Sequence, residues 1–130
     1  MDTLAVLRQN GIQPTPQRIA VAECVIGSSS HPTADEILAC VRRACPTASR
    51  ATVYNTLNLL VEKGLVRQHI LREGSTVFDG HVAAHHHFVD DETGEIRDLP
   101  WQALRVAGIE GLSDMEVREY QVVVRGRRCR

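Results

Sequence analysis

Apolar residues recur at helical spacing in four consecutive stretches of the first half of the chain. This pattern predicts helices over residues 2–10, from Thr15-Pro16 to about residue 26, from Thr33 onward, and from Ser49 to the Lys63-Gly64 stop. Thr15, Thr33 and Ser49 are hydroxyl residues of the kind that caps a first helical turn. In the last stretch, the spacing i, i+4, i+7, i+8 marks one buried face, made of Val53, Leu57, Leu60 and Val61.

Strand-like alternation follows the fourth predicted helix. Residues 65–71 are predicted to form a strand, residues 72–75 a turn and residues 76–78 a returning strand. Three helices and a two-stranded wing make a winged helix, so we predict a winged-helix DNA-binding domain over residues 1–80. The outer face of the last helix carries hydrogen-bonding and aromatic groups, as a major-groove helix needs, although a solvated polar face would look the same. The candidate DNA-binding residues are Arg18, Arg50, Thr52, Tyr54, Asn55, Thr56 and Arg67, with Arg72 as a further phosphate contact.

The second half of the chain predicts a smaller unit over residues 81–130. Strands are predicted over residues 85–90, 95–99 and 117–124, and a short helix over residues 100–107. A sheet with a helix can form a dimer surface, and operators bound by helix-turn-helix proteins usually have twofold symmetry. We therefore expect an α+β fold, with an N-terminal winged helix-turn-helix domain and a small C-terminal α/β domain for metal sensing and dimerisation.

Two histidines and one aspartate form a candidate metal site on the predicted hairpin. His85 and His87 lie on one face of their strand, because side chains alternate along a strand. If the turn at residues 91–94 is a symmetric four-residue loop, His87 lies opposite Asp98, whereas a three-residue loop with a bulge would turn Asp98 away. Two imidazoles and one carboxylate predict a site for a divalent metal, and the same set describes a non-haem iron oxygenase.

Two residues of the first half can add to this set. Asp79 comes just before the histidine cluster, and His31 lies in the loop before the third helix, where loop packing is its alternative role. A ligand from the DNA-binding half would let metal occupancy control domain orientation. Of the remaining histidines, His86 points to the opposite face of its strand, and His69 and His81 are expected to be ordinary surface or wing residues.

Composition and charge fit this division of the chain. Residues 1–72 carry eight Lys/Arg against five Asp/Glu, whereas residues 73–124 carry three against eleven. A basic first half and an acidic second half suit a nucleic-acid-binding domain joined to a cation-binding domain.

No apolar run reaches the roughly 20 residues of a membrane helix and the N-terminus does not resemble a secretory signal, so we expect a cytoplasmic protein without a membrane partner. In that compartment Cys24 and Cys40 are expected to be small core residues rather than a disulfide.

Taken together, these segments resemble the ferric uptake regulator (Fur) family over nearly the whole chain. The matching motifs are Gly11–Arg18, His31–Glu36, Ser49–Leu60, Glu62–Val66, Phe78-Asp79, His85–His87 and Gly94–Asp98. The resemblance implies a homodimer that binds palindromic operators in double-stranded DNA when loaded with metal, and usually represses. It also implies Fe(II) or Mn(II) as the ion, with Zn(II) possible in vitro, at a regulatory site formed by His31, Asp79, His85, His87 and Asp98.

Aspartates at both carboxylate positions resemble the peroxide-stress repressor (PerR) branch of the family. In that branch bound Fe(II) reacts with hydrogen peroxide and a coordinating imidazole is oxidised; the matching positions are His31 and His85. The structural zinc of the family uses two C-x-x-C pairs that this sequence lacks, so no four-cysteine zinc is expected. The same lack of cysteine pairs and the triple histidine resemble the Irr branch, iron regulators that respond to haem.

We therefore expect a metal-dependent repressor that senses peroxide, with an iron- or haem-responsive regulator as the alternative. A small Fe(II) oxygenase using His85, His87 and Asp98 is a third hypothesis. Five candidate ligands leave little room for a substrate, and an oxygenase would leave the helix at residues 49–60 unexplained. The residues thus favour a regulator over an enzyme.

Overall fold

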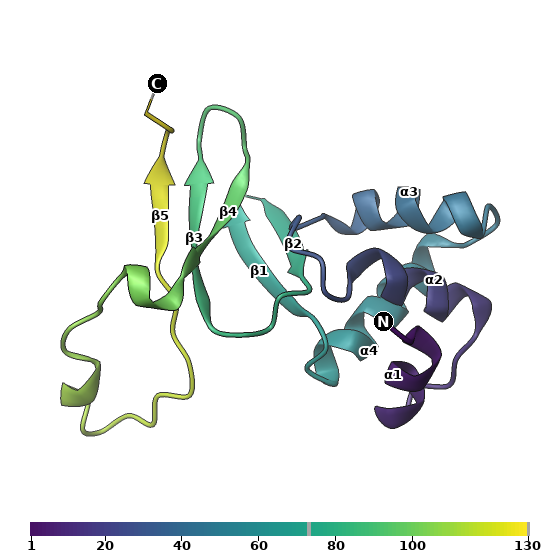
Figure 1. The fold of residues 1–130 in the computed structure, drawn as a ribbon, viewed down its shortest axis with the longest axis horizontal. Coiled ribbons are helices and arrows are strands. Elements are labelled where there is room, and N and C mark those ends of the chain that lie inside the picture. Colours follow the sequence, from purple (N-terminus) through teal and green to yellow (C-terminus); the bar gives the residue numbers. More distant parts are fainter. Residues whose placement is uncertain (73, 130) are drawn as a thin grey trace. The chain divides into compact units, whose positions relative to one another are not determined.

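The computed structural model describes residues 1–72 and 74–129, and the chain divides into two compact units, Met1–Val82 and Ala83–Arg130 (Figure 1). Within the described residues, the first unit contains four α-helices and a two-stranded sheet, and the second contains a three-stranded sheet and two short 3-10 helices. The predicted α+β fold class is confirmed. Among the described residues, no helix combines the length and the apolar character needed to cross a bilayer.

The first unit begins with four helices, each of which starts at a side-chain cap. They are α1 (Thr3–Gln9), α2 (Pro16–Val25), α3 (Ala34–Ala44) and α4 (Arg50–Glu62). The hydroxyls of Thr15, Thr33 and Ser49 each accept a hydrogen bond from the backbone N–H three residues later. These bonds satisfy donors that a helix leaves unpaired in its first turn. The four helices and the three caps predicted from the sequence are confirmed.

The helices enclose the apolar core of the first unit. Val53, Leu57 and Leu60 of α4 are 0% exposed, whereas Val61, predicted for the same face, is only partly buried. Burying one such aliphatic side chain contributes about 1.5–3 kcal/mol relative to leaving it in water. The buried stripe of α4 therefore fixes which side of this helix is left for solvent.

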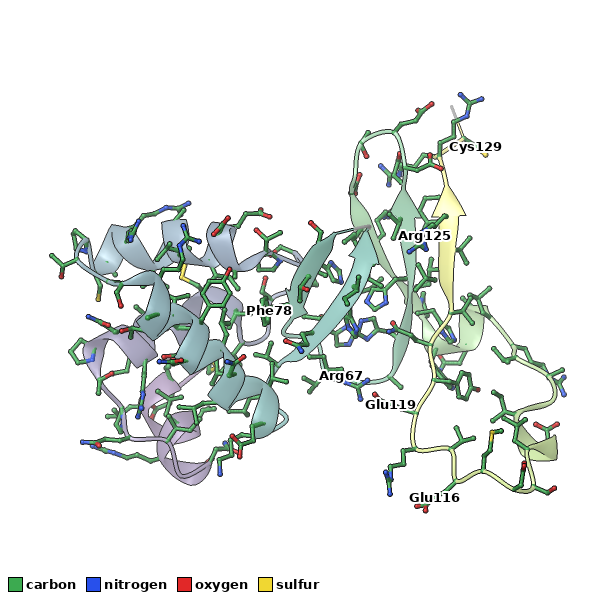
Figure 2. The ribbon with its side chains drawn as sticks, turned by 180° about the vertical axis from the view of Figure 1, so that it is seen from behind. Arg67, Phe78, Glu116, Glu119, Arg125 and Cys129 are labelled. Atoms are coloured by element: carbon green, nitrogen blue, oxygen red, sulfur yellow. A yellow bond between two sulfur atoms is a disulfide. The ribbon has the colours of Figure 1, made fainter. Side chains whose placement is uncertain are left out.

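Two antiparallel strands, β1 (Arg67–Arg72) and β2 (Ser75–Asp79), form the wing of the first unit. The end of β2 is tied to the helices, because Phe78 joins the helical core and its N–H donates to the Pro32 carbonyl at 2.8 Å (Figure 2). Glu73 of the predicted wing turn lies outside the described residues, and so does the side chain of Arg72, predicted as a phosphate contact.

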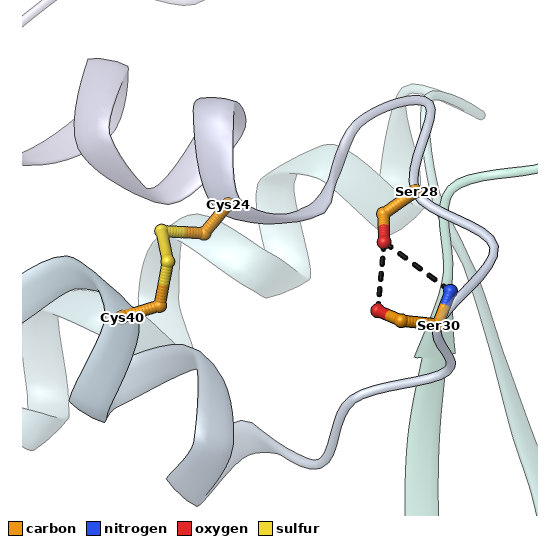
Figure 3. Close-up of a disulfide and its surroundings, with 4 residues drawn as sticks. All are labelled: Cys24, Ser28, Ser30 and Cys40. Atoms are coloured by element: carbon orange, nitrogen blue, oxygen red, sulfur yellow. Dashed lines mark hydrogen bonds between the residues drawn. A yellow bond between two sulfur atoms is a disulfide. The ribbon is translucent and has the colours of Figure 1, made fainter.

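One contact in the first unit corrects the sequence analysis. Cys24 of α2 and Cys40 of α3 are joined by a disulfide, with their Cα atoms 6.3 Å apart (Figure 3). The prediction of two unbonded core thiols is wrong. Helical spacing indicates that each cysteine faces inward, but it does not indicate which residue of the neighbouring helix each one meets. Among the described residues, Cys45 and Cys129 are free thiols.

The second unit is built on a sheet with the strand order β4-β3-β5. Its strands are β3 (His85–Asp90), β4 (Ile96–Pro100) and β5 (Val123–Gly126). β4 runs antiparallel to β3, and their register places His87 opposite Asp98. The register of a symmetric four-residue loop, predicted from the sequence, is therefore confirmed. β5 runs parallel to β3 along its other edge.

The connection between β4 and β5 differs from the prediction. In place of a helix over residues 100–107, it holds the short 3-10 helices η1 (Trp101–Ala103) and η2 (Ile109–Gly111). The strand predicted over residues 117–124 begins only at Val123. Leu104 already has an extended backbone conformation, so the helical segment ends after one turn, and apolar spacing alone overestimates its regularity.

His86 is buried on the other face of β3, as the alternation along the strand predicts. Its ring stacks on Trp101 with centroids 4.5 Å apart, and Trp101 also contacts Tyr120 at 4.9 Å between centroids. The Nδ1 atom of His86 accepts a hydrogen bond from the N–H of Val122 at 2.9 Å. These contacts anchor the β4–β5 connection to the strand that carries the candidate metal ligands.

Candidate metal centre

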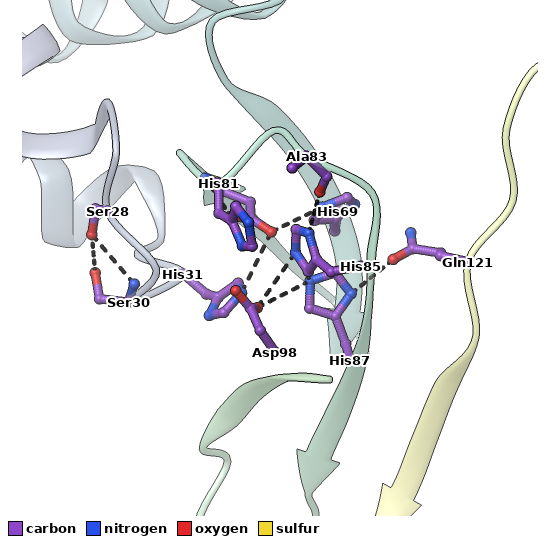
Figure 4. A network of polar contacts seen from close by, with 11 residues as sticks. Ser28, Ser30, His31, His69, His81, Ala83, His85, His87, Asp98 and Gln121 are labelled. Atoms are coloured by element: carbon purple, nitrogen blue, oxygen red, sulfur yellow. Dashed lines mark hydrogen bonds and ion pairs between the residues drawn. The ribbon is translucent and has the colours of Figure 1, made fainter. Parts of the chain in front are cut away.

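Three donor groups of the second unit converge on the β3–β4 hairpin, namely the imidazoles of His85 and His87 and the carboxylate of Asp98 (Figure 4). The Nε2 atom of His85 lies 3.1 Å from Nε2 of His87 and 3.4 Å from Oδ1 of Asp98. The Nε2 atom of His87 lies 3.7 Å from the same oxygen. Strand alternation and hairpin register thus bring together the three residues that the sequence predicts as hairpin ligands.

Both hairpin imidazoles are oriented through the ring nitrogen that faces away from this cluster. His85 Nδ1 donates to the Ala83 carbonyl at 2.6 Å, and His87 Nδ1 donates to Oε1 of Gln121 at 2.8 Å. A proton on Nδ1 leaves the lone pair on Nε2, which is the tautomer that a metal ligand needs. Sequence reasoning missed Gln121, since no local pattern relates position 121 to position 87.

A second group of donors lies in the first unit, around Asp79 at the end of β2. Oδ2 of Asp79 lies 3.5 Å from Nε2 of His31 and 3.4 Å from Nε2 of His69. Its other oxygen, Oδ1, accepts a hydrogen bond from the N–H of His81 at 2.9 Å. His31 and Asp79 are therefore neighbours, as a shared ion requires. His69 lies in a wing strand, as predicted, but the prediction of an ordinary surface position is wrong, because its side chain is 8% exposed and faces Asp79.

Backbone hydrogen bonds hold the loop before α3 against the end of β2. The N–H of Gly80 donates to the Ser28 carbonyl at 3.1 Å, and the N–H of Gly27 donates to the Gly80 carbonyl at 3.3 Å. A Cβ at Gly80 would lie 2.0 Å from a backbone oxygen, so only glycine permits this approach. Within the loop His31 has a φ of 56°, a left-handed conformation that is uncommon for a residue with a side chain. This conformation directs its imidazole toward Asp79.

The spacing between the histidine nitrogens and the aspartate oxygens fits ligands of a metal ion better than it fits hydrogen bonds. The histidine–aspartate distances in the two groups lie between 3.4 and 3.7 Å, beyond the roughly 2.7–3.2 Å of a hydrogen bond. Ligands held at about 2.1 Å from a tetrahedral ion lie about 3.4 Å from one another. Imidazole and carboxylate donors without sulfur suit Mn(II), Fe(II) and Zn(II) alike. Each unit therefore offers part of a coordination shell for a divalent transition-metal ion.

The candidate DNA-binding residues of α4 differ in exposure. Arg50, Tyr54 and Asn55 are exposed, and Thr52 is partly buried. Thr56 is only 2% exposed, and its hydroxyl donates to the Thr52 carbonyl at 2.8 Å. Its placement does not favour a direct contact with DNA, because position 56 is on the same side of the helix as the buried stripe.

The predicted arginine contacts come from three different elements. Arg50, at the start of α4, forms an ion pair with Asp35 of α3, and this hydrogen bond and charge raise the pKa of the guanidinium. Arg18, in α2, donates to the Gln13 carbonyl at 3.1 Å, and Arg67 begins β1 (Figure 2). A phosphate that binds Arg50 therefore has to compete with Asp35.

Comparison with known proteins agrees with the fold. A sequence profile of the Ferric uptake regulator family matches residues 9–124. The peroxide-responsive repressor PerR of Staphylococcus aureus is 33% identical over 129 residues, covering 96% of this chain and 86% of the relative. The structure of the Campylobacter jejuni peroxide stress regulator matches with a TM-score of 0.76 and 28% identity, over 100% of this chain and 98% of that one. The Pseudomonas aeruginosa ferric uptake regulator with manganese shares the fold, with a TM-score of 0.72, 24% identity and full coverage of both chains. The chain belongs to the ferric uptake regulator family of metal-responsive regulators.

Proposed function

We propose that this protein is a metal-dependent DNA-binding repressor in which donors from both units hold one divalent ion. The ligands are His31, Asp79, His85, His87 and Asp98. The observation that carries the proposal is that each unit offers an incomplete set of imidazole and carboxylate donors at the spacing of metal ligands. Two or three donors are too few for Mn(II) or Fe(II), so each set gains affinity from the other.

The short connection between the two sets supports a shared ion. Only residues 80–84 separate Asp79 from His85. Since an extended chain spans at most about 3.3–3.6 Å per residue, these two ligands cannot lie more than about 20 Å apart along the backbone. Such a tether gives one set an effective concentration in roughly the millimolar range toward an ion held by the other. An ion bound by both sets restricts the DNA-binding unit, and operator affinity then depends on metal.

DNA binding is assigned to the first unit. The exposed start of α4, with Arg50, Tyr54 and Asn55, supplies groups suited to base edges, and Arg18 and Arg67 supply charge for phosphates. A homodimer presents two such helices with twofold symmetry, which matches a palindromic operator. Operator binding also places the protein in the cytoplasm, where the DNA is.

Within this function, we propose hydrogen peroxide as the signal. When bound, Fe(II) would promote a net reaction in which hydrogen peroxide gives one oxygen atom to a ligand imidazole and its other oxygen leaves as water. His31 and His85 are the candidate targets, and an oxidised imidazole is a weaker nitrogen donor than histidine. Its conversion lowers metal affinity and releases the DNA-binding unit. The aspartates at positions 79 and 98 and the 33% identity to a peroxide-responsive repressor support this assignment.

A regulator of iron or haem status is the second candidate. Two features of the sequence favour it, the three consecutive histidines 85–87 and the lack of C-x-x-C pairs. Both candidates share the scaffold and differ in the signal, so one experiment on the purified protein separates them.

The test loads the apo protein with Fe(II) or Mn(II), adds hydrogen peroxide, and follows binding to promoter DNA by fluorescence anisotropy and ligand peptides by mass spectrometry. Peroxide sensing predicts one added oxygen atom on His31 or His85 and loss of DNA binding with Fe(II), and neither with Mn(II). Tight haem binding without histidine oxidation would favour the second candidate. Metal-independent DNA binding, or turnover of a small substrate without DNA binding, would overturn the repressor proposal.

A further inference from the structure

His69 is a buried imidazole for which the five-ligand proposal has no use. It lies in β1, paired with Val77 of β2, and Asp79 is the next residue of β2 on the same face. The Nε2 atom of His69 and the Nε2 atom of His31 approach the same oxygen, Oδ2 of Asp79, at 3.4 and 3.5 Å. The two histidines therefore lie at similar distances from this carboxylate oxygen.

The distance between His69 and Asp79 indicates what kind of contact this is. At 3.4 Å, the contact is longer than the roughly 2.7–3.2 Å of an N–H···O hydrogen bond that would orient a carboxylate. It equals the separation of about 3.4 Å between two ligands of one tetrahedral ion with bonds of about 2.1 Å. Asp79 is oriented instead through Oδ1, which accepts the hydrogen bond from His81 N–H.

We infer that His69 is a further metal ligand. This inference rests on the proposed function, and it gives the DNA-binding unit three donors of its own, His31, His69 and Asp79. The hairpin of the second unit also has three donors, two imidazoles and a carboxylate. A matched set in each unit means that the first unit retains an ion weakly when the hairpin donors are removed. His69 also adds a fourth imidazole nitrogen to those of His31, His85 and His87.

Co(II) is a suitable probe, because its visible absorption reports the number and type of its ligands. His69→Ala and the smaller change His69→Asn are compared in the full chain with Gln68→Ala, a neighbour that is exposed and alternates to the other face of β1. We expect a loss of at least tenfold in Co(II) and Mn(II) affinity in both His69 variants and a shifted Co(II) spectrum. Gln68→Ala is expected to match the wild type in both measurements.

Measuring Co(II) affinity in Asp98→Ala, with and without His69→Ala, tests this inference separately from the proposed function. If the proposed shared ion is correct, Asp98→Ala alone weakens binding, and adding His69→Ala to it removes most of the remaining Co(II) affinity. Affinity that falls in His69→Ala with an unchanged Co(II) spectrum would assign His69 an orienting role and overturn ligation. Unchanged affinity and spectrum would also overturn it, while leaving the five-ligand proposal intact. Circular dichroism of the metal-free variants verifies that each one is folded, and His69→Asn provides the measurement if His69→Ala is not.

Discussion

The two donor sets of this protein have the same chemistry but different origins in the sequence. The hairpin set comes from fourteen consecutive positions, 85–98, of one supersecondary element, so alternation and one turn determine it. The set around Asp79 combines a loop before α3, the middle of β1 and the end of β2. Its geometry depends on tertiary hydrogen bonds such as those of Gly80. A local set survives small changes in the rest of the fold, whereas a set assembled from distant segments depends on the whole unit.

The largest effect is expected from the covalent link in the first unit. Replacing Cys24 and Cys40 by serine should lower the free energy of unfolding by about 3 kcal/mol, the entropy contribution of a disulfide that closes a loop of this length. Urea denaturation of the oxidised protein measures it, with Cys45→Ser as the control. Reduced wild type should match the double variant. If thiol titration of the folded, air-oxidised protein found all four cysteines free, the disulfide would be refuted.

The second prediction tests whether the two sets share one ion. Asp79→Ala and Asp98→Ala remove one carboxylate from each set, and each change should weaken Mn(II) binding by about 100-fold or more, since even outer-shell partners of a metal contribute 10–100-fold. Titration calorimetry measures affinity and stoichiometry together. Two independent sites would give a different result: each variant would keep one ion at wild-type affinity and lose the other.

The contrast between the sets also explains how much of the site could be predicted. His87 is expected to lie opposite Asp98 because side chains alternate along a strand and the turn has four residues, and the structure agrees. The approach of His69 to Asp79, in contrast, depends on the register of the wing strands. Pairing of His69 with Val77 puts Asp79 one step along the same face. The sequence predicts both wing strands, but without their register a histidine in β1 cannot be related to an aspartate in β2.

In the fold as well, features set by neighbouring residues could be predicted from the sequence, whereas features set by contacts between distant segments could not. Helix starts at Thr15, Thr33 and Ser49 are local, because each cap bonds a residue three positions away, and all three were predictable. The Cys24–Cys40 disulfide depends on how α2 meets α3, which no periodicity encodes. The irregular segment between β4 and β5 is held by contacts such as that of Trp101 with His86, and the short apolar pattern there predicts a helix that the structure does not contain.

A smaller effect is expected at the DNA-binding surface of the first unit. Asp35 is paired with Arg50, so Asp35→Asn should free the guanidinium for phosphate and tighten DNA binding a few-fold, with a steeper salt dependence. Anisotropy titrations at two salt concentrations measure both quantities. Glu23→Gln in α2 removes an equal charge from an exposed position and serves as the control. Equal tightening in the two variants would mean that net charge, and not release of Arg50, is responsible.

The smallest effect concerns the hairpin turn of the second unit. Hydrogen bonds from the N–H groups of Thr93 and Glu92 to Asp90 hold the pKa of its carboxyl below the usual 3.8. A lowered pKa in the folded state means that this contribution to stability is present above about pH 4 and is lost as the pH falls through the folded value. Between pH 6 and pH 3, the metal-free Asp90→Asn variant should therefore lose less thermal stability than the wild type, and Asp91→Asn, the exposed neighbour, should follow the wild type. Parallel melting curves for all three proteins would show that the turn carboxylate does not stabilise the hairpin, and the hairpin set would then owe its geometry to strand pairing alone.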